Sequence, residues 1–335
     1  MTQVKAPEAA PKERAAPSRG VLRRQLQQFL AFASLIVLMA FFSIANPNFL
    51  TWSNVTGILL STAVIGILAL GTTFVIITGG IDLSLGTGMT LASVVTAMLL
   101  VTWGLPLAVG VLGGILFGAL MGFVNGFNVS ILKIPPFIAT LAMMLIAQGL
   151  ALVISGTAPI YFTGVPGFTD ISRGSLIPGL QLPNAVLILF ALTAIAAVLL
   201  GKTILGRYTF AIGSNEEATS ISGINVRKWK IIIYTLSGAF TGIAGVVLAA
   251  RLNSAQPALG LGYELQAIAA VVIGGTSLRG GKGSIIGTLI GALIMGVLVN
   301  GLRIMSIPQE WQTVVVGVVI LVAVYTDILR RGKGG

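Results

Sequence analysis

The sequence predicts an all-α integral membrane protein of about ten transmembrane helices. Of its 335 residues, 56% are hydrophobic and only 9% are charged, whereas soluble domains carry about 25% charged residues. The apolar residues fall into runs long enough to cross a bilayer, and most basic residues stand between these runs. Because helices in lipid pack together as one bundle, we expect a single polytopic domain over residues 26–330. Two similar glycine-rich stretches within it suggest an internal repeat of broken helices.

The first element is a hydrophilic tail over residues 1–25. Its opening sequence, MTQVKAPEAAPKERAAPSRG, is rich in Ala, Pro and charge, and it lacks the apolar residues that folding requires. The apolar run that follows is too long for the hydrophobic region of a signal peptide. We therefore expect a disordered cytoplasmic tail followed by a signal anchor.

Ten apolar runs then give the candidate spans. A helix needs about 20 apolar residues to cross about 30 Å of hydrocarbon, and Pro, Gly and charge clusters mark where each run ends. The eighth run is shorter than the others. The runs lie near 27–46, 56–78, 83–102, 106–128, 136–155, 184–201, 231–250, 262–276, 284–302 and 309–328.

Basic residues predict the orientation of these spans. With the amino terminus inside and ten crossings, only Arg173, Arg251 and Arg303 of the 20 Lys and Arg residues fall outside, which leaves seventeen in cytoplasmic segments. The positive-inside rule predicts this asymmetry. We expect a multi-pass membrane protein with both termini in the cytoplasm, and its net charge of +11 reflects topology and not nucleic-acid binding.

Two connections are longer than is usual between packed helices. The outer one, about 156–183, is rich in Gly, Pro and aromatic residues. It either caps the outer mouth or contacts an external partner, or it is a structured connector. The inner one, 202–230, carries five basic residues and the only adjacent pair of acids in the chain.

The inner loop contains the sequence GSNEEATSISGINVRKWK, which predicts a short helix from Asn215 to Ser222. Ser214 and Glu217 have the spacing of a capping box. Glu216 and Glu217 suit the first turn of a helix dipole, and Gly223 ends the helix. Because so short a helix needs packing to be stable, it either lies against the membrane surface or enters a groove on a partner.

Two glycine-rich stretches repeat within the chain. GGIDLSLGTG (79–88) and GGTSLRGGKG (274–283) are identical at five of ten positions. Each predicts a helix, a glycine break and a second helix, as in transporters built from duplicated halves. The alternative is coincidence in a chain with 43 glycines, and the sequence does not decide between a parallel and an inverted repeat. The residues assigned to the two breaks are Gly79, Gly80, Asp82, Gly86, Gly274, Gly275, Ser277 and Gly281.

Asp82 is the only ionisable side chain within the first four predicted spans and their connections. A carboxylate near hydrocarbon is costly unless it is satisfied locally or kept for a function. Its position before LSLG favours a helix cap that accepts from the backbone N–H of Ser84 or Leu85, and the aligned Ser277 is another favoured cap. The alternatives are a gate or an ion pair with Arg279 or Lys282.

Several kinds of chemistry are excluded. The chain has no Cys and no His, so it has no disulfides, thiol nucleophiles or usual zinc ligand sets, and we expect no cofactor and no metal. The sequence RGGKGS is not a Walker A motif, because Thr276 stands where its first Gly would be and Gly283 follows Lys282. An ATP-driven process would need another chain to bind ATP.

Four segments carry a family resemblance: ITGGIDLSLG, PPFIATLAMM, GRYTFAIGSNEEATSISGINV and ARLNSAQPALGLGYELQAIAAVVIGGTSLRGGKGSIIGTLIGAL. They resemble the permease subunits of bacterial ATP-binding-cassette sugar importers, in the branch of the ribose, xylose and arabinose systems. The similarity runs from about Pro47 to Asp327. It implies that this chain is a non-enzymatic transport subunit, with ribose as the first expected sugar.

The resemblance also implies partners. In such permeases a cytoplasmic loop with Glu-Ala-Ala, three residues and Gly docks into the ATPase subunit; Glu217, Ala218 and Gly223 match, and neighbouring Glu216 belongs to the same predicted site. Thr219 stands where the second Ala would be. The implied partners are an ATP-binding subunit, a periplasmic sugar-binding protein and a second permease copy, in a homodimer or with a close relative.

A neutral sugar needs hydroxyl-compatible donors and acceptors, so amide side chains are the candidates for its path, although each can instead bridge helices. One alternative is an ion-coupled secondary transporter, which would use Asp82 or Glu264. Another is a membrane-embedded enzyme, for which clustered acids, His or Cys are missing. The candidate path residues are Asn125, Asn128, Gln148, Asn253, Gln256, Gln266 and Asn300.

Overall fold

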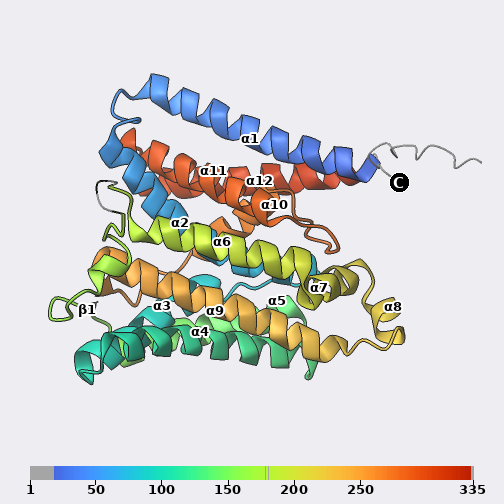
Figure 1. The fold of residues 1–335 in the computed structure, drawn as a ribbon, viewed down its shortest axis with the longest axis horizontal. Helices are drawn as coiled ribbons and strands as arrows, with labels where there is room; N and C mark the ends of the chain where they lie inside the picture. Colours follow the sequence, from blue (N-terminus) through green and yellow to red (C-terminus); the bar gives the residue numbers. More distant parts are fainter. Residues whose placement is uncertain (1–18, 178, 180, 333–335) are drawn as a thin grey trace, which may run out of the picture.

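The computed structural model describes residues 19–332 apart from 178 and 180. The described chain is nearly all helical, and its long helices lie side by side (Figure 1). In chain order the elements are α1 (Arg19–Ala45), α2 (Trp52–Ile77), α3 (Leu85–Ala97) with the π-helical turn η1 (Met98–Thr102), α4 (Leu107–Ser130), α5 (Pro136–Ser155), β1 (Ile160–Tyr161), the 3₁₀ turn η2 (Thr169–Ile171), α6 (Asn184–Lys202), α7 (Ile204–Ser214), α8 (Glu216–Ile221), α9 (Val226–Leu252), β2 (Ser254–Ala255), α10 (Tyr263–Ile273), α11 (Ile285–Ile304) and α12 (Gln309–Gly332).

Each of the ten predicted spans falls on one of these helices. Within the described residues, 7 helices are long and apolar enough to cross a membrane: α2, α3 with η1, α4, α5, α6, α9 and α11. The other three predicted spans coincide with shorter apolar stretches, Phe29–Ala45, Tyr263–Ile273 and Gln309–Tyr325. The all-helical, multi-pass class is therefore confirmed, while a count of ten crossings stays a prediction.

The amino-terminal boundary differs from the predicted one. Helix α1 begins at Arg19, so the boundary placed near residue 25 falls inside the helix. The predicted disordered tail otherwise lies outside the described residues.

The centre of the bundle is α2. All of its residues from Thr62 to Ile77 are buried, and it packs against α6, α9, α10 and α11. The peripheral helices α4 and α5 instead expose large apolar side chains such as Leu116 and Leu145, as helices facing lipid do.

Helices α4 and α9 touch through their backbones. A Cβ on Gly118 of α4 would lie 2.7 Å from the Cα of Gly242, and a Cβ on Gly122 would lie 2.9 Å from the Cα of Gly238. Such contacts require small residues at the interface, and they supply the van der Waals packing that holds helices together in lipid.

The two ends of the bundle carry different features (Figure 1). The start of α1, α7, α8 and the last residues of α12 lie at one end, and β1 lies at the other. At that end β1 pairs antiparallel with β2, with Ile160 opposite Ala255. The rings of Phe162 and Phe168 stack with their centroids 3.9 Å apart, and both residues are buried. Part of the predicted outer loop is thus packed into the bundle, and its contact with an external partner stays a prediction.

Candidate functional site

Helix α7 occupies a segment that was expected to be loop. Leu205, Thr209 and Ile212 recur at three- to four-residue intervals, and Thr209 and Ile212 are buried against the bundle. Helix α7 packs on α2, α6 and α9. The helical spacing of these residues is the signal that could have identified it; two glycines and Arg207 interrupt the apolar pattern.

The cap of α8 differs from the predicted capping box. Asn215 is the N-cap, and its Oδ1 accepts from the backbone N–H of Ala218 at 2.9 Å. Ser214 is instead the last residue of α7, because the chain turns to an extended conformation at Asn215 (φ −161°). The prediction of a capping box between Ser214 and Glu217 was therefore wrong.

The rest of the α8 prediction agrees with the structure. Glu216 and Glu217 form the first turn, where carboxylates favour the helix dipole. Gly223 has φ +84° directly after the C-cap Ser222, and its N–H donates to the Ser220 carbonyl at 3.0 Å. A left-handed glycine at this position ends the helix.

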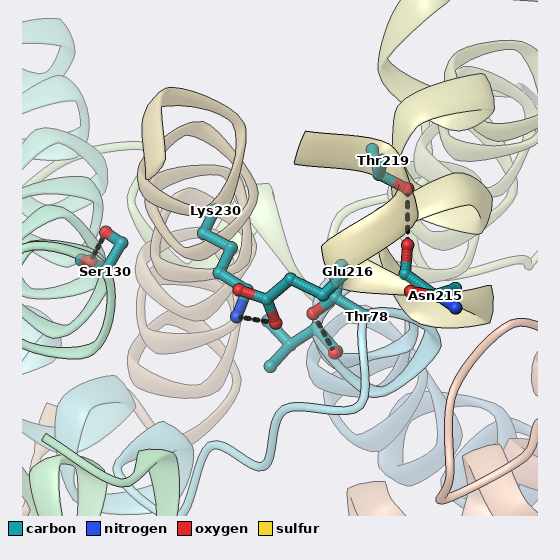
Figure 2. A network of polar contacts seen from close by, with 8 residues as sticks. Thr78, Ser130, Asn215, Glu216, Thr219 and Lys230 are labelled. Carbon is teal, nitrogen blue, oxygen red and sulfur yellow. Dashed lines mark hydrogen bonds and ion pairs between the residues drawn. The ribbon is translucent and has the colours of Figure 1, made fainter. Parts of the chain in front are cut away.

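Helix α8 is held at its base and exposed at its tip. Lys230 Nζ donates to Glu216 Oε2 at 2.6 Å, and Thr219 Oγ1 donates to the Asn215 carbonyl at 2.7 Å (Figure 2). Ile221 is 80% exposed, so this large apolar side chain is largely free of contacts with the rest of the described bundle.

A cavity of about 610 Å³ lies beside α8. It is bounded by the α4–α5 connection and by the start of α9. The side chains on its wall are charged or polar at the α8 side, and at the α4 side they are mixed, with Ser130 and Lys133 among apolar residues. The wall residues are Val129, Ser130, Lys133, Ile134, Pro135, Pro136, Glu216, Glu217, Ser220, Val226, Arg227 and Lys230.

The first glycine break follows α2. Gly79 has φ +78°, its N–H donates to the Ile76 carbonyl at 2.9 Å, and the N–H of Gly80 donates to the Val75 carbonyl at 3.1 Å. This pair of bonds is a Schellman motif, which satisfies carbonyls at a helix end.

The second break follows α10 and uses the same motif. Gly275 has φ +89°, its N–H donates to the Val272 carbonyl at 2.9 Å, and the N–H of Thr276 donates to the Val271 carbonyl at 3.1 Å. Gly79 therefore corresponds to Gly275, so the alignment of Gly79 with Gly274 was wrong by one residue. A common origin of the two stretches stays a prediction.

The following helices begin at serines, not at the predicted caps. Ser84 is the N-cap of α3, and Ser284 is the N-cap of α11, where its Oγ accepts from the Gly287 N–H at 3.3 Å. Ser277 was wrongly predicted to cap: its N–H donates to the Lys282 carbonyl at 3.0 Å and closes a loop.

Asp82 stabilises the first break without occupying the cap position. It is only 2% exposed, and its Oδ1 accepts from the backbone N–H of Ser84 at 2.9 Å, as predicted, and from the Ser84 hydroxyl at 2.6 Å. Asn125 of α4 in turn donates to Ser84 Oγ at 2.8 Å. Within the described residues Asp82 forms no ion pair with Arg279 or Lys282.

Gly86 and Gly281 also lie in close backbone contacts. A Cβ on Gly86 would overlap the carbonyl oxygen of Gly260 and the carboxylate of Glu264. The N–H of Gly281 donates to the Ile77 carbonyl at 2.8 Å, so the two breaks touch each other.

The structure does not gather the predicted path residues at one site. Asn125 lies beside the first break, whereas Asn253 ends α9 and its carbonyl accepts from the Phe162 N–H at the β1 end. Gln256 donates to Ser254 Oγ at 3.3 Å. Asn300 lies in α11 near Gly57 of α2. The other three, Asn128, Gln148 and Gln266, are partly exposed.

The fold is that of a polytopic membrane protein with two helix breaks enclosed in protein, an architecture typical of transport proteins. The family model described as "Branched-chain amino acid transport system / permease component" matches residues 54–324. The chain belongs to this family of transport permeases, as its motifs predicted.

Curated relatives cover nearly the whole chain. It is 45% identical over 303 residues to ribose import permease protein RbsC of Bacillus subtilis (strain 168), with 90% of this chain and 93% of that protein covered. The identity to RbsC of Escherichia coli (strain K12) is also 45% over 303 residues, covering 90% and 94%. Xylose transport system permease protein XylH of Haemophilus influenzae is 36% identical over 366 residues, covering 92% and 98%. No solved structure matches the chain.

Replacing Asn215 with Ala tests the cap of α8. Loss of an N-cap costs about 1 kcal/mol, which corresponds to roughly five-fold faster amide hydrogen exchange at Ala218. Ser214→Ala is the matched control and should leave this exchange rate unchanged. Faster exchange in Ser214→Ala with no change in Asn215→Ala would instead support the Ser214–Glu217 capping box.

Asp82→Asn and Asp82→Ala separate hydrogen bonding from charge. An Asn Oδ1 accepts the same two bonds from Ser84, whereas Ala leaves two buried donors unpaired at a cost of about 1–3 kcal/mol each. Thermal unfolding of the detergent-purified protein should show a lower midpoint for Asp82→Ala and a nearly native one for Asp82→Asn. Equal losses in both variants would show that the negative charge itself is required.

Proposed function

We propose that this chain is the permease subunit of an ATP-binding-cassette importer that conducts a monosaccharide, with ribose as the first candidate. The observation that carries the proposal is the 45% identity, over 90% of the chain, to ribose import permeases. Relatives named for fructose and allose import are 37% and 38% identical. Sugar import is thus shared by these relatives, and the preference for ribose rests on the higher identity.

The proposed topology is ten crossings of the bacterial inner membrane with both termini in the cytoplasm. The grouping of the α1 start, α7, α8 and the α12 end at one end of the bundle supports it (Figure 1). Helix α9 begins beside α8 and ends at β2, so Arg251 lies toward the opposite end. This is the arrangement that the positive-inside rule favours.

The proposed docking element is α8 with Glu216, Glu217, Ala218 and Gly223. Three features support it: its side-chain cap, the exposed Ile221 and the cavity at its side. A short helix outside the bundle gains stability when it enters a groove on a partner. The ATP-binding subunit is that partner in our proposal, and ATP hydrolysis takes place there.

The permease itself performs no covalent chemistry in this scheme. Nucleotide-dependent closure of the ATPase moves α8 and shifts the bundle between outward and inward opening. A periplasmic binding protein delivers the sugar, and a second permease copy completes the path. Among the predicted path residues, Asn125, Asn253 and Asn300 each have a buried Oδ1 without a partner in the described chain. Of these three, only Asn125 and Asn300 are buried as whole residues, so they are our first candidates for accepting from sugar hydroxyls.

Reconstitution tests the function directly. Vesicles containing the permease, an ATP-binding subunit and a sugar-binding protein should take up labelled ribose only when ATP is supplied on the ATPase side. Each protein is omitted in turn as a control. Uptake by the permease alone under a proton or sodium gradient would contradict the proposal and favour an ion-coupled transporter.

Variants of α8 test docking. Glu217→Lys reverses a charge in the first turn, and Gly223→Ala strains a left-handed residue by about 1–2 kcal/mol; both should reduce co-purification of the ATPase at least five-fold with normal membrane insertion. Gly156→Ala is the matched control, because Gly156 is also left-handed (φ +62°) with no atom near its Cβ position, but it ends α5. Unchanged co-purification of the α8 variants would refute the assignment.

A further inference from the structure

Three segments that are far apart in the sequence meet at one backbone contact near α8: the end of α2, the second break and the last turn of α7. The N–H of Gly281 donates to the Ile77 carbonyl at 2.8 Å. Gly213 of α7 lies against both groups, since a Cβ on Gly213 would overlap the Ile77 oxygen and lie 2.6 Å from the Gly281 nitrogen.

The contact is equally close when seen from the second break. A Cβ on Gly280 would lie 2.8 Å from the Gly213 oxygen and 2.9 Å from the Gly79 nitrogen. A Cβ on Gly281 would lie 3.0 Å from Ser214 Oγ. We call this contact of Ile77, Gly79, Gly213, Gly280 and Gly281 the glycine junction.

The glycine junction is joined to α8 by a very short stretch of chain. Only Ser214 separates Gly213 from Asn215, the cap of α8. Asn215 is bonded in both directions: its N–H donates to the Ala211 carbonyl of α7 at 3.1 Å, and its side chain accepts from the Ala218 N–H of α8. A displacement of α8 therefore reaches Gly213 without a flexible linker between them.

We propose that Gly213 is a positioning residue that couples α8 to both helix breaks through the glycine junction. Flexible side chains absorb a displacement by changing rotamer, whereas backbones in contact have no such freedom and transmit it. Movement of α8 thus shifts the α2–α3 break and the α10–α11 break together. The inference rests on the proposed function, and it assigns a role to the repeated glycine stretches.

The consequence concerns the start of α3. The first break carries the buried Asp82–Ser84–Asn125 bonds. A shift at Ile77 and Gly79 therefore acts on Asn125, one of the two buried amides proposed to meet the sugar. The glycine junction links the ATPase end of the protein to its proposed path.

Gly213→Ala in the reconstituted complex tests the proposal. We expect normal assembly with the ATPase, because the α8 cap is untouched. Ribose uptake per ATP hydrolysed should fall at least ten-fold, and ATP hydrolysis should no longer rise when sugar-loaded binding protein is added. A wild-type ratio of uptake to hydrolysis in this variant would overturn the proposal, since a purely structural role changes abundance and not this ratio.

Gly201→Ala is the matched control. Gly201 is also a helical glycine, one turn before α7, and no atom lies within 4 Å of its Cβ position. Its uptake and its coupling ratio should stay within two-fold of the wild type. Absence of ATP-dependent uptake in the wild-type complex would instead refute the proposed function.

A cross-link tests the same contact even where Gly213→Ala lowers membrane abundance. The chain has no Cys, so Ser214→Cys with Gly281→Cys provides one engineered pair. Because Gly281→Cys itself adds a Cβ to the glycine junction, Ser214→Cys alone is the control for uptake through an intact junction, and the oxidised pair is compared with the reduced pair. If α7 and the second break move as one body, the oxidised complex keeps at least half of the uptake of the reduced complex. Uptake that is blocked by oxidation and restored by reduction would show that the contact opens, which would overturn the proposal.

Discussion

Close contact between backbones, made possible by glycine, is the interaction on which the rest of this structure depends. Lipid tails are as apolar as leucine, so helices in a membrane gain little from apolar burial and associate through fine packing instead. Gly118 and Gly122 bring α4 against α9 in this way, and Gly213 brings α7 against the end of α2. The first contact builds the bundle, and the second joins it to the exposed helix α8.

A second constraint shapes the two breaks. Backbone groups outside helices must find partners within the protein when water is absent. Both breaks meet this requirement with a Schellman motif, and Asp82 and Asn125 satisfy the first further by holding Ser84. A carboxylate that looks costly in the sequence is thus part of the support of a helix start. Because hydrogen bonds hold each break together, we infer that each break moves as a unit.

The sequence was most informative where lipid acts on length and hydropathy. All ten apolar runs are helical, because a segment of that length and composition has few alternatives in a bilayer. Local details were less predictable: Ser214 and Asn215 are both good caps, and only the backbone turn at Asn215 decides between them. Each break contains two adjacent glycines, and either of them can take a positive φ. The sequence alignment therefore paired Gly79 with Gly274 instead of Gly275. The meeting of Gly213 with Ile77 and Gly281 depends on tertiary packing and has no local signal.

In our proposal, α8 and the two breaks form one moving body in an ATP-driven permease. Spin-label distances in the full complex test it most directly, with labels at Ile221 of α8, at exposed Arg279 of the second break and at Trp103 at the far end of α3. On ATP binding, we expect the distance between the labels at 221 and 279 to stay constant while both labels move relative to the label at 103. A 221–279 distance that changes as much as the 221–103 distance would contradict it.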